Sequence, residues 1–244
     1  MIPYHPSRQP LVTGRRPRRP RRPCQLVLLG LMVALITAAA VATATNMDTL
    51  LASLRQLGGT EATFRDWQKL LNDTKPLGAM DKLKRVNEFF NRRIQFGEDQ
   101  QIWGQSDYWA TPLETLAKGK GDCEDFTIAK YFTLLNVGVP VEQLRLVYVK
   151  AKIGGAASTV TQAHMVLAYY STPDAEPVVL DNLITDLRPA SRRPDLAPVF
   201  SFNSQGIWQG AGGGDAKGPG AAVGSGRLSR WEDLLKRARA EGFD

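Results

Sequence analysis

Cysteine and histidine are scarce in this chain of 244 residues, which contains two of each. Cys24 and His5 belong to the N-terminal segment, so the rest of the chain contains only Cys123 and His164. A single cysteine cannot form an intramolecular disulfide, and in an oxidising compartment it is a candidate reactive thiol. Any chemistry there that needs a cysteine and a histidine must therefore use this one pair.

Acidic residues are absent before Asp48. All seven basic residues before position 25 are arginines, and subtracting them from the total of 31 leaves 24 basic against 24 acidic residues. The formal net charge of +7 therefore belongs to the N-terminal segment. A basic chain suggests nucleic acid as a partner, but a formally neutral remainder removes that support. We expect no nucleic-acid binding.

Residues 1–44 have the three-part order of a secretory signal peptide. Arginines precede an apolar run from Leu26 to Ala40, and small residues close the segment at Ala44. This order predicts export with cleavage after Ala44. The alternative is an uncleaved anchor, because the 19 residues from Leu26 to Ala44 approach the roughly 20 that a spanning helix needs. Both alternatives place the remaining chain outside the cytoplasm.

The remaining chain changes composition near residue 208. Residues 45–208 are long enough for one compact domain. Residues 209–244 contain glycine-rich stretches that are typical of a flexible tail, closed by a short amphipathic helix that ends near Glu241.

The apolar pattern predicts helices first and strands afterwards. Helical spacing occurs over Met47–Gly58, Ala62–Leu71, Lys75–Arg93 and Cys123–Asn136. Strand-like segments follow at Leu144–Val149, Ala163–Tyr170 and Val178–Leu183. This order predicts an α+β fold in which an antiparallel sheet packs against the helix that begins at Cys123.

Cys123 is predicted to lie in the first turn of a helix capped by Asp122. Unpaired amides and the helix dipole favour a thiolate there. A lone cysteine is more often a buried structural residue. Its acidic neighbours argue against an apolar environment, so we interpret Cys123 as a nucleophile.

His164 begins a predicted strand, and a histidine there is more often structural than catalytic. It is, however, the only base available to Cys123 beyond the N-terminal segment. Asp181 follows the apolar segment Pro177–Leu180, where it could orient the imidazole as the third member of a triad. Asp181 could equally be a turn residue.

Asp122, Glu124 and Asp125 place negative charge around Cys123. A carboxylate about 8 Å away costs a thiolate roughly 2 kcal/mol at an effective dielectric constant near 20. A bound dication would neutralise this charge. We therefore hypothesise a calcium site built on these three acids. Alternatively, the acids only complement the helix dipole.

Five sequence blocks together resemble the bacterial transglutaminase-like cysteine proteinases. They are Asp107–Glu114, Gly121–Phe126, Ala163–Tyr170, Val179–Leu183 and Pro198–Asn203, within a region from about Trp67 to Trp208. The cysteine, histidine and aspartate blocks occur in the family's order. Agreement across several separated blocks is more specific than any one of them.

The resemblance implies a papain-like or transglutaminase-like fold, in which Cys123, His164 and Asp181 match the family triad. It implies calcium dependence, carried by Asp122 and Glu124, with Asp125 a less certain ligand. It also implies a periplasmic endopeptidase that cleaves the N-terminal region of a large surface adhesin and so controls biofilm attachment. An inner-membrane receptor for cyclic di-GMP is the implied regulatory partner.

Other activities remain open for the same site. The acyl-transfer residues would also suit a transglutaminase or an amidase acting on peptidoglycan, and an inert Cys123 would leave a calcium-responsive binding module. The segment Ile153–Gln162 looks longer than the family pattern, which leaves substrate choice open. The backbone N–H of Cys123 is a natural oxyanion donor, and Trp109 or its neighbours could supply a second.

Overall fold

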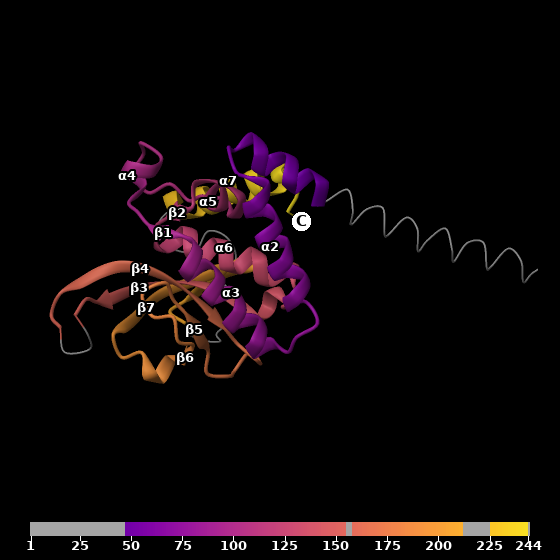
Figure 1. Cartoon of the computed structure of the whole chain (residues 1–244). Coiled ribbons are helices and arrows are strands. Elements are labelled where there is room, and N and C mark those ends of the chain that lie inside the picture. Colours follow the sequence, from indigo (N-terminus) through magenta and orange to yellow (C-terminus); the bar gives the residue numbers. More distant parts are fainter. Residues whose placement is uncertain (1–46, 155–157, 212–224, 244) are drawn as a thin grey trace, which may run out of the picture. The chain divides into compact units, whose positions relative to one another are not determined.

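The computed structural model describes residues 47–154, 158–211 and 225–243 (Figure 1). The proposed signal segment and most of the glycine-rich stretch lie outside these residues, so the domain boundaries at residues 44 and 208 remain predictions. No helix in the described ranges is long and apolar enough to cross a membrane.

The helical layer contains the predicted helices with small changes at their ends. Residues 47–56 are helical, and α2 (Glu61–Thr74) and α3 (Ala79–Arg93) follow. Short helices α4 (Asp99–Ile102) and α5 (Pro112–Lys118) lead to α6 (Cys123–Asn136). α2 and α3 bury only one face of each helix, whereas every side chain from Asp125 to Leu134 of α6 is buried. A helix buried all round is a central element of the core.

A six-stranded antiparallel sheet forms the second layer, in the order β6-β5-β4-β3-β7-β8. The central strands are β3 (Leu144–Lys152) and β4 (Thr161–Tyr169), which pair along their whole length. β5 (Val178–Leu180) and β6 (Arg188–Pro189) lie on one side, and β7 (Leu196–Asn203) and β8 (Gly206–Gln209) on the other. The α+β prediction is confirmed, although β7 and β8 were not among the predicted strands.

The two faces of the sheet have separate apolar clusters. Met165, Leu167 and Tyr169 of β4 belong to the larger core that includes α6, whereas Val166 and Ala168 belong to a smaller cluster. This division follows from the alternation of side chains along a strand. α6 therefore packs against one face of β4.

A short parallel pair of strands leads into α6. β1 (Gln95–Phe96) pairs with β2 (Lys120–Gly121), and α5 ends in the left-handed residue Gly119. Gly121 lies so close to Asp125 that an added Cβ would approach the Asp125 Cβ to 2.7 Å. Only glycine fits this approach without a shift of the helix.

The C-terminal helix α7 (Ser225–Glu241) packs into the same core. Trp231 makes edge or tilted ring contacts with Tyr131, Phe132 and Phe202, and Phe243 contacts Trp67. Arg237 donates a 2.7 Å hydrogen bond to the Trp109 carbonyl. α7 thereby supports the segment that precedes α5.

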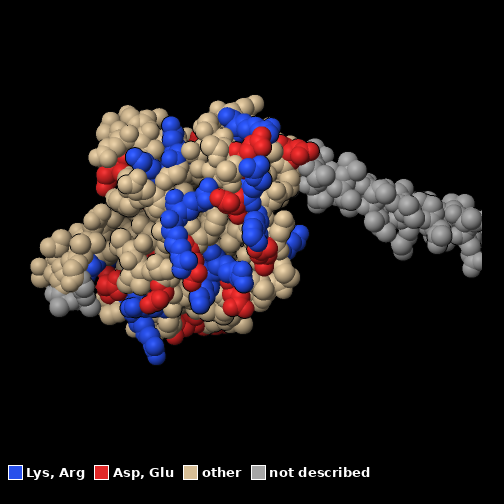
Figure 2. All heavy atoms as spheres, viewed as in Figure 1, with Lys and Arg blue, Asp and Glu red and all other residues tan. Residues whose placement is uncertain are grey.

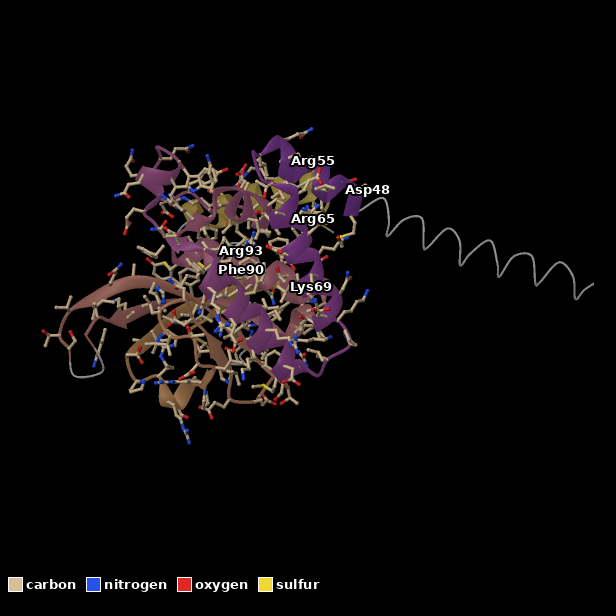
Figure 3. All side chains as sticks on the ribbon, in the orientation of Figure 1. Asp48, Arg55, Arg65, Lys69, Phe90 and Arg93 are labelled. Atoms are coloured by element: carbon tan, nitrogen blue, oxygen red, sulfur yellow. The ribbon has the colours of Figure 1, made fainter. Side chains whose placement is uncertain are left out.

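The face formed by α2 and α3 carries charges of both signs (Figure 2). Figure 3 labels Lys69 on α2, Arg93 on α3 and Arg55 on the preceding helix of residues 47–56. They form ion pairs with Asp73, Asp66 and Glu61 respectively. Alternating charges do not form the continuous basic surface that nucleic acid binding uses. The expected absence of nucleic-acid binding remains a prediction.

Candidate active site

Cys123 is the first residue of α6 and is half-buried. Its thiol donates a 2.8 Å hydrogen bond to Glu124 Oε2. Burial raises the pKa of the Cys123 thiol, and the negative charge of Glu124 raises it further, while a hydrogen bond from the Met165 backbone lowers it. For the pKa of this thiol, burial and the acidic neighbours therefore outweigh the helix N-terminus.

His164 and Asp181 are brought together by adjacent strands. His164 lies on β4, Asp181 directly follows β5, and His164 Nε2 lies 2.8 Å from Asp181 Oδ1. Burial acts to raise the pKa of Asp181, but hydrogen bonds from His164, Leu183 and Arg193 lower it to about 2. An ionised Asp181 accepts a hydrogen bond from the Nε2–H group of His164. In neutral His164 the lone pair therefore lies on Nδ1.

Arg193 holds the other side of the Asp181 carboxylate. Its Nη2 donates a 2.8 Å hydrogen bond to Asp181 Oδ2, and its Nε donates a 3.0 Å hydrogen bond to Asp195 Oδ1. Arg193 is itself buried. The two oxygens of Asp181 thus have different charged or polar partners, which fixes the carboxylate beside His164.

Thr127 connects the cysteine helix to the histidine strand. Its Oγ1 lies 2.8 Å from the Cys123 carbonyl and 3.1 Å from the Met165 carbonyl. Met165 follows His164 in β4. One buried hydroxyl therefore links the backbone at both predicted catalytic residues.

Cys123 and His164 line one cavity of about 570 Å³. Asp122 and Glu124 also line it, together with Trp109, whose indole N–H donates to Asp107 Oδ1 at 3.1 Å. The cavity provides room for a polypeptide segment at the thiol. The backbone N–H of Cys123 lies at the start of α6, where it has no partner within the helix and can donate a hydrogen bond to an oxyanion in the cavity.

Two groups of possible metal-ligating side chains lie at the start of α6 and share Asp122. Ligand oxygens of Asp99, Asp122 and Asp125 lie within 4.8 Å of one another, as do ligand atoms of Asp122, Cys123 and Glu124. Oδ1 of Asp99 and Oδ1 of Asp122 are buried without a hydrogen-bond partner within the described residues. Burial raises the pKa of Asp122 to about 10 and that of Asp99 to about 6.

These orphaned carboxylate oxygens fit a calcium ion. Calcium takes six to eight oxygen ligands, and buried carboxylates this close need a cation or a proton. Asp125 is different, because its Oδ1 accepts a 2.8 Å hydrogen bond from Ala110 N–H and its Oδ2 a 3.4 Å bond from Asp122 N–H. Asp125 therefore also holds the helix start, whereas Asp99 and Asp122 have oxygens without partners.

Six site residues were predicted from the sequence, and the structure places all of them around the start of α6 or beside the adjoining strands. Their roles remain predictions. Asp99, Thr127 and Arg193 were not predicted. Asp99 lies 23 positions before Asp122, and no motif spacing connects the two. No local sequence pattern marks Arg193 as a site residue either, because only the folding of the chain brings it into contact with Asp181.

Comparison with known proteins supports a proteinase. Residues 67–194 match the family described as bacterial transglutaminase-like cysteine proteinase BTLCP. A comparison with curated protein sequences finds no match.

Solved structures of LapG from Legionella pneumophila are similar over most of the chain. The calcium-bound form is 38% identical with a TM-score of 0.64, covering 78% of this chain and 98% of that one. The EGTA-treated form is 37% identical with a TM-score of 0.64, covering 78% and 97%.

Proposed function

Because the chain belongs to the bacterial transglutaminase-like cysteine proteinases, we propose that it is a calcium-dependent cysteine endopeptidase that uses Cys123, His164 and Asp181. The observation that carries this proposal is the buried pair His164 and Asp181, hydrogen-bonded at 2.8 Å in front of the cavity that contains Cys123. An inert binding module has no need of an imidazole held in one tautomer. The similar LapG structures, described as calcium-bound and EGTA-treated, support the metal requirement.

The reaction begins with proton transfer from the Cys123 thiol to His164 Nδ1. The thiolate attacks the peptide carbonyl carbon, and the Cys123 N–H stabilises the oxyanion. The proton on Nδ1 then passes to the departing amine as the C–N bond breaks, which leaves a thioester. Water gives a proton to His164 and attacks the thioester. The C–S bond then breaks, the carboxylic acid product leaves, and His164 returns the proton to the Cys123 thiolate. Asp181 orients His164 throughout.

Asp99, Asp122 and Glu124 are the residues that would hold calcium, with Asp125 at their side. Bound calcium supplies positive charge that offsets these carboxylates near the thiol. The protein's own residues then hold the reacting groups. Arg193 fixes Asp181, and Thr127 fixes the start of α6 against β4.

For the biological role, we propose a periplasmic protease that cleaves the N-terminal region of a large surface adhesin. The signal-like residues 1–44 and the resemblance to adhesin-releasing family members support this role. A segment with consecutive alanines and a glycine is the proposed cleavage motif. An inner-membrane receptor for cyclic di-GMP is the proposed partner that sequesters the protease and so retains the biofilm.

The test measures cleavage of denatured casein and of a synthetic peptide that contains consecutive alanines and a glycine. The wild-type chain and Cys123→Ser are compared in calcium and in EGTA, and new termini are identified by mass spectrometry. We expect cleavage only by the wild type in calcium. Incorporation of an added amine without hydrolysis would indicate a transglutaminase, and release of muropeptides from peptidoglycan an amidase. The absence of all three reactions would contradict the enzyme assignment.

A further inference from the structure

One edge of the histidine strand is open where it passes the cavity. β4 pairs with β3 from Thr161 to Tyr169, but with β5 only from Leu167 to Tyr169. Among the residues that the structure describes, no strand pairs with Thr161–Val166 on the β5 side. In Figure 1 the β3–β4 hairpin extends well beyond the short β5.

The cavity occupies the place that a longer β5 would fill. Its lining includes Gln162 and Ala163 from β4, and Asn182 and Leu183, which follow β5. After Leu180 the chain leaves the strand pairing, and Leu183 N–H turns back to donate to Asp181 Oδ1 at 3.0 Å. Space for an extended chain therefore lies directly beside the open edge.

The direction of the backbone groups on this edge follows from Met165. The Met165 carbonyl lies 3.1 Å from Thr127 Oγ1 of α6, so its polar backbone groups point away from β3. Backbone groups alternate in direction along a strand, so those of Ala163 point the same way. Ala163 is exposed and lines the cavity. Its N–H and C=O are directed at the space beside Cys123.

The rim of the cavity is apolar as well as open. Phe96, Ile153 and Leu183 line it, and their side chains are 51%, 40% and 56% exposed. They make up half of the large hydrophobic residues that are exposed in the described part of the chain. Exposed apolar groups that surround a groove indicate a binding surface.

We propose that the substrate binds as an additional β-strand on the open edge of β4, with its backbone bonded to the N–H and C=O of Ala163. The occupant is an extended, unfolded segment of a protein chain, because only such a segment presents a free row of backbone groups. Its side chains contact the rim formed by Phe96, Ile153 and Leu183. This inference rests on the proposed peptidase function.

The position of the bond to Ala163 sets the register. Thr127 Oγ1 lies 2.8 Å from the Cys123 carbonyl and 3.1 Å from the Met165 carbonyl, so Met165 lies beside the start of α6. Ala163 is two residues away from Met165, or roughly 7 Å along the strand. The substrate residue that pairs with Ala163 therefore lies within about two positions of the scissile bond. Neighbouring substrate N–H groups point away from β4 and take no part.

The first test compares Ala163→Pro with Ala163→Val in the full chain in calcium. Proline removes the N–H that points away from β3 and takes no hydrogen bond from the β3–β4 pairing, and it is tolerated in strands at open edges. Valine adds comparable bulk and keeps the N–H. With the peptide containing consecutive alanines and a glycine, we expect Ala163→Pro to raise KM roughly three- to tenfold. Ala163→Val also places bulk in the cavity but keeps the N–H, so it should raise KM less than Ala163→Pro does, and iodoacetamide should alkylate Cys123 at the same rate in all three proteins.

The second test methylates each backbone nitrogen of that peptide in turn. We expect losses of cleavage at alternate positions, including one within two residues of the scissile bond. Equal KM values for the two variants together with a methylation profile that shows no alternation would overturn the edge-strand proposal and leave the peptidase assignment intact. A wild-type chain that cleaves neither casein nor the peptide would overturn both.

Discussion

At the scale of single residues, Asp181 is held by partners of different kinds on its two oxygens. His164 contacts Oδ1 and Arg193 contacts Oδ2, each at 2.8 Å. The ionised state of Asp181 therefore specifies which nitrogen of His164 is free to act as the base. A substitution of Asp181 that keeps the side-chain volume but removes the charge should alter the tautomer of His164 more than it alters the stability of the fold.

We expect Asp181→Asn to lower kcat for peptide cleavage by roughly 10²- to 10⁴-fold, because an amide no longer enforces the productive tautomer. Asp195→Asn is the matched control, since Asp195 also binds Arg193 but does not contact His164. Steady-state kinetics in calcium measures both. A similar loss in the two variants would assign Asp181 a structural role only.

Lys130 of α6 is a second informative residue, with 1% of its surface exposed. Burial lowers the pKa of Lys130 to about 7, although the charge of Asp181 acts to raise it. In the unfolded chain its pKa is about 10.4. Between these values the unfolded chain binds more protons, so Lys130 makes the free energy of unfolding rise with pH, by at most about 1.4 kcal/mol per unit.

We predict that Lys130→Met loses this rise and is more stable than the wild type below pH 7. Urea unfolding at about pH 6.5 and about pH 9 tests this, with calcium present throughout. Lys84→Met, which changes an exposed lysine on α3, should follow the wild type. If Lys130→Met keeps the wild-type dependence on pH, Lys130 does not titrate in this window.

At the scale of elements, the site depends on the contact between α6 and β4. Thr127 is the hydroxyl that touches both, beside Cys123 and beside His164. Elsewhere on the same helix, Thr133 accepts a 3.0 Å hydrogen bond from the Trp67 indole. The two threonines offer a comparison between a buried bond at the site and a buried bond in the core.

We expect Thr127→Val and Thr133→Val each to lower the free energy of unfolding by about 1–3 kcal/mol, because each leaves a buried polar group unpaired. Only Thr127→Val should also lower kcat/KM, since it releases the cysteine from the histidine strand. Chemical unfolding and peptide cleavage measured on the same samples separate the effects. Equal kcat/KM values in the two variants would show that Thr127 does not position the site.

The elements near the nucleophile were the most predictable part of the fold. Asp122 is an N-cap residue and Gly138 is a stop signal, so the helix Cys123–Asn136 could be bounded from local signals alone. β7 was not predicted, because Pro198 and exposed residues at its start weaken the strand pattern. Asp99 and Arg193 reach the site only through tertiary contacts that local pattern does not encode.

At the scale of the whole molecule, the chain's C-terminal helix completes the core. Trp231, Leu234 and Phe243 are each at most 4% exposed. Residues 209–244 looked like a tail because glycine-rich stretches separate this helix from the sheet. The composition of the glycine-rich stretch does not reveal what the helix after it packs against. For this reason the burial of α7 was not predicted.

Ending the chain at Ala211 should abolish cooperative folding. Each large side chain of α7 that is lost from the core contributes roughly 1.5–3 kcal/mol, and a typical domain has only about 5–15 kcal/mol in total. Thermal unfolding followed by circular dichroism tests this, with Arg239→Ala as an exposed control on the same helix. A truncated chain that melts like the full one would contradict the role of α7.

In the proposed enzyme, burial and the acidic residues beside Cys123 raise the pKa of its thiol, and a bound cation offsets the charge of the acids. The most direct measurement is the rate at which iodoacetamide alkylates Cys123 near pH 7, in calcium and in excess chelator, for the wild type and His164→Ala. We expect fast alkylation only for the wild type in calcium. Equal, slow alkylation in all four samples would contradict this expectation, because Cys123 and His164 would then form no reactive pair.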